Sequence, residues 1–315
     1  MEFFLSSIIT ARGISRKEPE KTMERKPARV LTIAGSDSGG GAGIQADLKT
    51  ITVLGGFGMS VITALTAQNT LGVQGIFEVP ISFIEQQFDA VATDIGVDAA
   101  KTGMLVSAAV VRAVAAKIRQ HRIEKLVVDP VLTAKDGVRL IEDEAMETLV
   151  SDLLPLAFVV TPNVPEAEVM AEMTISSVAD MKEAARRIRR FGVPNVIVKG
   201  GHLPGEALDI LYDGSTYHEF AAERIETKDT HGTGCTFSAA LATGLALGKP
   251  LHDSVREAKS YITEVIRYAW RIGGGHGPTN HAAPLFNALD RCRRHSDGGS
   301  NKNPERRDES DSGIR

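Results

Sequence analysis

Residues 228–236, Lys-Asp-Thr-His-Gly-Thr-Gly-Cys-Thr, form a glycine-rich turn that is followed by a run of small and apolar residues, 237–247, without proline. This pattern predicts a helix that begins near Thr233. The first-turn N–H groups of a helix have no partner inside it, and together with the helix dipole they favour an anion. Cys235 lies at this N-terminus, where the pKa of a thiol is usually lowered, so it could serve as a base or a nucleophile. The alternative is a helix cap beside a buried cysteine, because short glycine motifs often occur without function.

The composition indicates a globular protein of one α/β domain or two small ones. The chain has 315 residues, of which 43% are apolar, and a formal charge of −4, which argues against a general nucleic-acid binder. No apolar run approaches the length of a membrane span, so we expect no membrane partner. The two cysteines, Cys235 and Cys292, cannot form a disulfide framework and favour a reducing, cytoplasmic location.

The two ends of the chain differ from its middle. Residues 3–9 form an apolar patch, but Glu2 precedes it and no positive segment does, which excludes a secretory signal. Basic residues downstream would permit a transit peptide, although acidic residues follow them closely. We expect residues 1–28 to be a disordered or mis-started extension, since Met23 lies just before the first strand. Residues 291–315 are polar and predict a disordered tail.

Short apolar segments alternate with segments of helical periodicity along the rest of the chain. This alternation predicts parallel βαβ units whose sheet is covered by helices on both faces. Residues 208–225 alternate weakly around Asp213-Gly214 and predict a hairpin. We expect one domain, residues 29–290. The predicted strands are 30–34, 61–67, 99–104, 126–128, 158–160 and 196–198, and the predicted helices are 44–54, 81–91, 108–118, 144–154, 178–191, 237–247 and 253–272.

Polar residues collect where the predicted strands end. Ligands of parallel α/β sheets bind beyond the carboxyl ends of the strands, so this clustering indicates a site. The first glycine loop, residues 35–43, fits a loose dinucleotide fingerprint only weakly, and it is not a P-loop because no Gly-Lys-Ser/Thr follows. The polar residues at strand ends are Ser36, Asp37, Gln68, Lys101, Asp129, Asn163, Glu166 and Lys199.

Residues 32–50, Thr-Ile-Ala-Gly-Ser-Asp-Ser-Gly-Gly-Gly-Ala-Gly-Ile-Gln-Ala-Asp-Leu-Lys-Thr, resemble the opening signature of hydroxymethylpyrimidine/phosphomethylpyrimidine kinases, the thiamine-pathway members of the ribokinase-like superfamily. Residues 60–70, 199–202, 227–236 and 275–281 resemble further blocks of that family, and the likeness runs from about residue 29 to 285. It implies a mostly parallel sheet flanked by helices on both faces. It also implies ATP-dependent phosphorylation of 4-amino-5-hydroxymethyl-2-methylpyrimidine to the monophosphate and then the diphosphate, for thiamine phosphate synthesis.

The resemblance assigns the catalytic turn. It makes Cys235 the base of the first phosphorylation, where most sugar kinases of the superfamily have aspartate, and makes Gly232 and Gly234 part of the anion hole. The helix N-terminus favours the thiolate, whereas burial would oppose it. In the second step the nucleophile is an ionised phosphate oxygen, so the need for a base falls.

The resemblance also places the pyrimidine. Gln68 can offer its amide as both donor and acceptor to the aminopyrimidine edge. Gly35, Met104 and Val131 are implied to line the same site. Without the resemblance, Met104 and Val131 would be read as core residues.

ATP and magnesium are the implied partners of the remaining polar residues. Lys199, Thr233 and Asn163 are expected to bind the phosphates of ATP. Asp129 and Glu166 suit Mg²⁺ held through water, because magnesium prefers oxygen ligands and keeps waters.

Several residues have structural alternatives. Asn163 could instead cap a helix that begins near Pro165. Asp37 is expected to organise the glycine loop through N–H bonds. His202 and His231 lack metal-ligand spacing and are expected to be structural.

Two other functions compete with the pyrimidine kinase. A pyridoxine/pyridoxal kinase of the same superfamily would share the fold and the cysteine, and its substrate is also a heteroaromatic ring with a hydroxymethyl group. A pyrimidine-binding sensor is the alternative outside enzymes. A homodimer is expected, since two-fold dimers are common and the family tends that way.

Overall fold

The computed structural model describes residues 26–132, 140–201, 203 and 205–297. One sheet runs through these residues in the order β3-β2-β1-β4-β5-β6-β7-β8-β9. Neighbouring strands from β2 to β7 pair in parallel, and antiparallel pairs occur at the two edges, β2 with β3 and β7 through β9. The strands are β1 (Ala28–Asp37), β2 (Gly56–Asn69), β3 (Gly72–Glu78), β4 (Ala99–Thr102), β5 (Leu126–Val128), β6 (Val159–Val160), β7 (Asn195–Lys199), β8 (Ala207–Tyr212) and β9 (Tyr217–Ala222).

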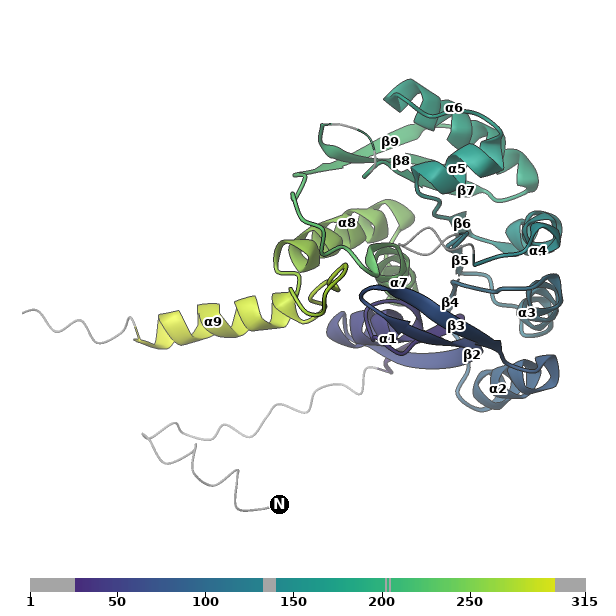
Figure 1. Cartoon of the computed structure of the whole chain (residues 1–315), viewed down its shortest axis with the longest axis horizontal. Coiled ribbons are helices and arrows are strands. Elements are labelled where there is room, and N and C mark those ends of the chain that lie inside the picture. Colours follow the sequence, from purple (N-terminus) through teal and green to yellow (C-terminus); the bar gives the residue numbers. More distant parts are fainter. Residues whose placement is uncertain (1–25, 133–139, 202, 204, 298–315) are drawn as a thin grey trace, which may run out of the picture.

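Helices cover both faces of this sheet (Figure 1). Helices α2 to α6 lie on one face, and α1, α7 and α8 lie on the other, with α9 extending away from the body. The helices are α1 (Gly43–Val53), α2 (Ile81–Asp94), α3 (Ala108–Gln120), α4 (Asp143–Thr148), α5 (Val164–Ala171), α6 (Val178–Ile188), α7 (Thr233–Ala246), α8 (Leu251–Arg267) and α9 (Ala283–Asp297). This architecture confirms the expected mostly parallel sheet flanked by helices.

Strands β1, β5, β6 and β7 are largely apolar because each of them contributes to two cores. In β5, Leu126 and Val128 pack with α2 to α6, while Val127 packs with α7 and α8. Successive strand residues point to opposite faces, so a strand covered on both sides cannot alternate with polar residues. Full burial of such a side chain stabilises the fold by about 1.5–3 kcal/mol.

The structure differs from the sequence prediction in several elements. The helix expected over 144–154 ends at Thr148 and is followed by a π-helix, Leu149–Leu153. Strand β3 was not predicted. The helix expected over 253–272 ends at Arg267, because the chain then turns back and Trp270 N donates to Pro278 O. The tail expected to be disordered from residue 291 is helical as far as Asp297, since α9 continues through Arg291–Arg294 with good helix formers and no glycine or proline.

Most of the two terminal segments expected to be disordered, residues 1–25 and 298–315, lies outside the described residues, as does His202. Among the helices that the structure describes, none is long and apolar enough to span a membrane.

Candidate active site

The polar residues at strand ends lie together beyond the carboxyl ends of the parallel strands, as the strand topology requires. Gln68 is on β2, and Lys199 is the last residue of β7. Asp129 follows β5 directly, and Asn163 caps α5 after β6. The N-terminus of α7 lies at the same edge, because Gly234 is close to both Lys199 and Asp129.

The first glycine loop packs directly on the turn that begins α7. Gly232 has a left-handed φ of 83°, and a Cβ on it would lie 1.8 Å from Gly41 O. A Cβ on Gly41 would in turn lie 2.4 Å from His231 Cδ2. Glycine is therefore required at both positions, by close approach at Gly41 and by close approach and conformation at Gly232. The contact brings the N-termini of α1 and α7 together.

Asp37 holds this arrangement. Its carboxylate accepts hydrogen bonds from the N–H groups of Gly39 (2.8 Å), Gly41 (3.0 Å) and Ala42 (2.8 Å). His231 Nε2 lies 2.8 Å from Asp37 Oδ2. Burial opposes ionisation of Asp37, but the contact with His231 and the N–H bonds outweigh it and lower the pKa of the carboxyl. The prediction that Asp37 organises the glycine loop is confirmed, and His231 is its partner across the turn.

The residues expected to contact a pyrimidine lie in two neighbouring groups. Gln68 Nε2 is 3.5 Å from His231 Nε2, and Gln68 Oε1 accepts from Thr66 at 3.1 Å. A Cβ on Gly35 would lie 2.4 Å from Met104 Cε, so these two are in contact. Met104 also belongs to a small apolar cluster with Ala64 and Leu140, against which Val131 packs. These contacts fit the wall of a ring site and equally a small core.

Lys199 and Asp129 form an ion pair at the other side of the α7 turn. Lys199 Nζ donates to Asp129 Oδ1 at 2.9 Å, and Ser238 donates to Asp129 Oδ2 at 3.2 Å. A Cβ on Gly234 would lie 3.4 Å from Lys199 Nζ and 3.6 Å from Asp129 Oδ2. The first turn of α7 therefore faces one cation and one carboxylate.

Glu166 and Asn163 form a capping box at the start of α5. Asn163 N donates to Glu166 Oε2 at 2.8 Å, and Glu166 N donates to Asn163 Oδ1 at 2.9 Å. The capping role expected as an alternative for Asn163 is thus present. Burial raises the pKa of Glu166 to about 7, although the Lys199 ammonium acts in the opposite direction.

The thiol of Cys235 differs from its expected state. The helix N-terminus predicts a lowered pKa, but burial among protein groups raises it to about 11, even though part of the residue surface is accessible. Lys101 is the largest influence in the lowering direction, and Gly43 N–H also contributes by bonding to the thiol. The expectation of a low pKa was wrong because desolvation outweighs the helix terminus.

Near Cys235 lies a buried ion pair to which the sequence pattern assigned no function. Lys101 Nζ is 2.9 Å and 3.0 Å from the two carboxylate oxygens of Asp47. Lys101 stood among the polar strand ends, which was a usable signal. Asp47 had no signal beyond being a carboxylate within the predicted helix 44–54.

Thr233 uses its hydroxyl locally. Its Oγ1 donates to Thr230 O at 2.7 Å, which closes the turn before α7. Its backbone N–H donates to the same oxygen at 3.3 Å, so a phosphate would have to displace one of these two bonds to bind Thr233.

The carboxylates of the site fit magnesium held through water. Within the part of the chain that the structure describes, no cluster of three or more His, Cys, Asp or Glu side chains could enclose a metal ion. Asp129 already accepts bonds from Lys199, Ser238 and Thr161. Mg²⁺ commonly uses one or two protein carboxylates together with waters and substrate phosphates, which these residues allow.

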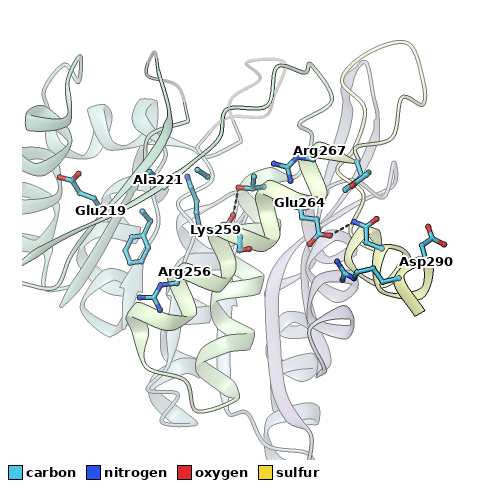
Figure 2. A pocket seen from close by; sticks show the side chains of 14 residues that line it. Glu219, Ala221, Arg256, Lys259, Glu264, Arg267 and Asp290 are labelled. Carbon is cyan, nitrogen blue, oxygen red and sulfur yellow. Dashed lines mark hydrogen bonds between the residues drawn. The ribbon is translucent and has the colours of Figure 1, made fainter. Parts of the chain in front are cut away.

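A pocket of about 760 Å³ lies between β9, α8 and α9. Figure 2 shows Glu219 and Ala221 from β9, Lys259 and Arg267 from α8, and Asp290 from α9 around it. Lys259 pairs with Asp209 at 2.8 Å, and Asp209 accepts from Gly200 N at 3.1 Å. None of the site residues described above lines this pocket. Its wall residue Lys259 is nevertheless linked through Asp209 to Gly200, which follows Lys199 in the chain.

The family model and the most similar sequences agree with one another. The family model described as phosphomethylpyrimidine kinase matches residues 37–280. The thiamine biosynthesis bifunctional protein ThiED of Geobacter sulfurreducens is 56% identical over 263 residues, which cover 83% of this chain and 54% of that protein. The hydroxymethylpyrimidine/phosphomethylpyrimidine kinase of Bacillus subtilis is 49% identical over 267 residues, covering 84% of this chain and 98% of the kinase.

Among solved structures, the ADP complex of Bacillus subtilis pyridoxal kinase is similar, with a TM-score of 0.78 and 38% identity. The similarity covers 83% of this chain and all of that one. The chain therefore spans about half of the ThiED protein, but nearly the full length of single-domain vitamin kinases.

Proposed function

The chain belongs to the phosphomethylpyrimidine kinase family, and we propose that it uses ATP to phosphorylate 4-amino-5-hydroxymethyl-2-methylpyrimidine and then its monophosphate. The diphosphate would serve thiamine phosphate synthesis. The observation that supports this proposal is the α7 turn, where Cys235 lies in the first turn of the helix and Gly234 faces Lys199 and Asp129.

In the first step the hydroxymethyl oxygen attacks the terminal phosphorus of ATP. Cys235 would act as its thiolate, after its own proton has left to solvent. The substrate O–H proton then passes to Cys235 Sγ as the new O–P bond forms, and the bond between that phosphorus and the departing ADP oxygen breaks. The N–H groups of Gly232 and Gly234 would stabilise the negative charge that develops on the transferred group. In the second step the attacking oxygen belongs to a phosphate that is already ionised, so Cys235 is needed less.

Gln68, Gly35, Met104 and Val131 would hold the pyrimidine. A Cβ on Gly35 would lie 2.4 Å from Met104 Cε, so a side chain at this position would displace the methionine that is proposed to contact the ring. Gln68 lies next to His231, and the amide can pair with the aminopyrimidine edge.

Lys199, Thr233 and Asn163 would bind the ATP phosphates. Lys259 lines the pocket of Figure 2 and pairs with Asp209, which accepts a hydrogen bond from Gly200 N, next to Lys199. This link between the pocket and Lys199 supports a nucleoside placed toward the pocket. Asp129 and Glu166 would hold Mg²⁺ through water, and the ion would neutralise phosphate charge. The raised pKa of Glu166 supports this role, since a buried carboxyl that ionises near pH 7 gains from a nearby cation.

The test follows ADP and both phosphorylated pyrimidines by mass spectrometry after the hydroxymethylpyrimidine and Mg-ATP are supplied. Monophosphate followed by diphosphate is the expected result. Monophosphate alone would refute the bifunctional activity, and a strong preference for pyridoxal under matched conditions would favour the rival kinase, whose structure is similar to this one. Consumption of ATP that depends on the pyrimidine would exclude a sensor.

A homodimer in the cytoplasm completes the proposal. Leu65 and Phe77 face each other across β2 and β3 and are 46% and 64% exposed, and Leu71 at the turn is 68% exposed. Apolar side chains gathered at a sheet edge favour a second copy as partner. The reduced thiol that catalysis needs at Cys235 fits a reducing compartment.

A further inference from the structure

The side-chain amide of Gln68 lies between two polar side chains of the proposed ring site. Its Nε2 atom is 3.5 Å from His231 Nε2, and its Oε1 atom is 3.1 Å from Thr66 Oγ1. The backbone of Gln68 is fixed against the first glycine loop, because Ser38 Oγ accepts from Gln68 N and donates to Gln68 O, both at 2.8 Å. The amide therefore extends from a fixed backbone, and its orientation depends on its two neighbours.

The Nε2 atom of His231 acts as a hydrogen-bond donor. It is 2.8 Å from Asp37 Oδ2, and the same carboxylate accepts bonds from three backbone N–H groups of the first glycine loop. These three donors favour the ionised carboxylate, which has no proton to give. The proton of the contact between His231 and Asp37 therefore belongs to Nε2, whether the imidazole is neutral or charged. A ring nitrogen that carries a proton cannot accept one from the amide nitrogen of Gln68.

The Thr66 hydroxyl constrains the other end of the amide. Thr66 Oγ1 lies 3.0 Å from Ser36 O, a carbonyl oxygen that can only accept, so the hydroxyl proton is directed there. Because a hydroxyl has one proton, Thr66 cannot also donate to Gln68 Oε1, but it can accept a bond from the amide nitrogen. Turning the amide over places Nε2 at Thr66 and Oε1 at His231, which satisfies both neighbours. The two ends of a glutamine amide have nearly the same shape, so its orientation follows from these bonds.

We propose that His231 and Thr66 are positioning residues that hold the Gln68 amide with its oxygen toward the α7 turn, and that they thereby select a ring with a donor group next to the carbon that bears the hydroxymethyl group. In this orientation the outer edge of the amide offers an acceptor on the His231 side and a donor on the Thr66 side. The inference deepens the proposed function and rests on it for the placement of the ring at Gln68.

The aminopyrimidine matches this edge of the amide. Its 4-amino group donates to Gln68 Oε1, and its ring nitrogen N3 accepts from Gln68 Nε2. The hydroxymethyl group is on C5, next to the amino-bearing carbon and away from N3, so this pairing directs it toward the His231 side. His231 precedes Cys235, the proposed base, in the same turn. The opposite orientation of the amide would direct the hydroxymethyl group away from that turn.

Pyridoxal does not match the same edge. A carbon next to its hydroxymethyl-bearing carbon has a formyl group, whose oxygen can only accept, so two acceptors would face each other at Gln68 Oε1. The 4-oxo analogue of the pyrimidine reverses the pattern completely, since it has an acceptor at O4 and a donor at N3. The relative affinity for the 4-amino and 4-oxo pyrimidines therefore measures the orientation of the amide.

The experiment measures the dissociation constants of these two pyrimidines by isothermal titration calorimetry, with the full-length chain and without ATP. The parent chain should bind the 4-amino ring about 10²-fold more tightly, because the 4-oxo ring leaves polar groups unpaired against the amide. Thr66→Val and His231→Leu leave the amide free to turn over, so this ratio should fall by about tenfold or more in each. Thr66→Ser is the matched control for Thr66→Val, since it keeps the hydroxyl and should keep the ratio.

The ratio of the two affinities distinguishes positioning from support of the fold. An unchanged ratio in Thr66→Val and in His231→Leu, with both affinities lowered together, would show a structural role and overturn the proposal. A parent chain that prefers the 4-oxo ring would also overturn it, since the amide would then have the opposite orientation. If one of the two variants does not fold, the other decides.

The orientation of the amide can also be measured in the free chain by NMR. The Gln68 Nε2 protons should show stronger nuclear Overhauser effects to the Thr66 methyl group than to the His231 ring, and the reverse pattern would overturn the inference. Gln68→Glu assigns the amide signals by removing them. A chain that has the expected amide orientation but binds neither ring would instead refute the proposed function, so the two failures are distinguishable.

Discussion

Alanine at Gly234 tests whether the α7 turn faces the transferred phosphate. The new Cβ would meet Lys199 Nζ at 3.4 Å and Asp129 Oδ2 at 3.6 Å, which are ordinary contact distances. Gly234 lies within α7, where alanine is more favourable than glycine by about 1 kcal/mol. We expect the free energy of unfolding to stay the same or rise by that amount. Phosphoryl transfer should fall on the order of 10²-fold, because the methyl group fills the space in front of both charged groups.

Alanine at Gly232 is the matched comparison two residues earlier. Its Cβ would lie 1.8 Å from Gly41 O, and the φ of 83° is left-handed. The left-handed conformation costs about 1–2 kcal/mol for a residue with a Cβ, and the collision with backbone adds to it. We expect a total loss of about 3–5 kcal/mol.

Urea unfolding and ADP release, measured on both variants and the parent chain, separate the two effects. Gly232→Ala should lose stability and activity together, whereas Gly234→Ala should lose activity alone. A Gly234→Ala protein that is destabilised as much as Gly232→Ala would refute the contact distances. Full activity in Gly234→Ala would refute the placement of the phosphate at this turn.

Three further predictions follow from other parts of the site. Cys235→Ala should slow the first phosphorylation by about 10²–10⁴-fold and the second much less, and equal losses in rapid-quench assays would exclude the cysteine as the base. Between pH 5.5 and pH 8 in EDTA, the folded chain should lose about 2 kcal/mol of stability, because the pKa of Glu166 is raised to about 7 and its proton is bound more tightly in the folded state. Glu166→Gln should remove that loss in urea titrations, and an unchanged pH dependence would contradict the assignment. Phe77→Glu should convert the proposed dimer to a monomer in sedimentation velocity, whereas an unaltered mass would place the interface elsewhere or show that none exists.

Much of the fold is predictable because its pattern is local. Buried strands such as β5 read as short apolar runs, and the βαβ alternation then determines a parallel sheet. Strand β3 was missed because every one of its residues is at least partly exposed and two of its seven are glycine, which leaves no apolar stripe. The edge pairing with β2, rather than burial, makes it a strand.

The site was less predictable where contacts join distant residues. Burial raises the pKa of the Cys235 thiol, whereas the sequence indicates only that the cysteine lies at a helix N-terminus. The partner of His231 is Asp37, 194 residues earlier, and no local spacing connects them. The local sequence therefore predicts which residues form the turn, whereas tertiary contacts determine how they ionise.

The packing of the first glycine loop against the α7 turn has a consequence for synthesis of the protein. Asp37 emerges from the ribosome early, whereas His231 follows 194 residues later. At about 5–20 residues per second, the loop waits on the order of 10–40 s for the turn that completes it. During that interval the glycine loop lacks its contacts with His231 and Gly232. A chain released before His231 would therefore lack the partner of Asp37 across the turn.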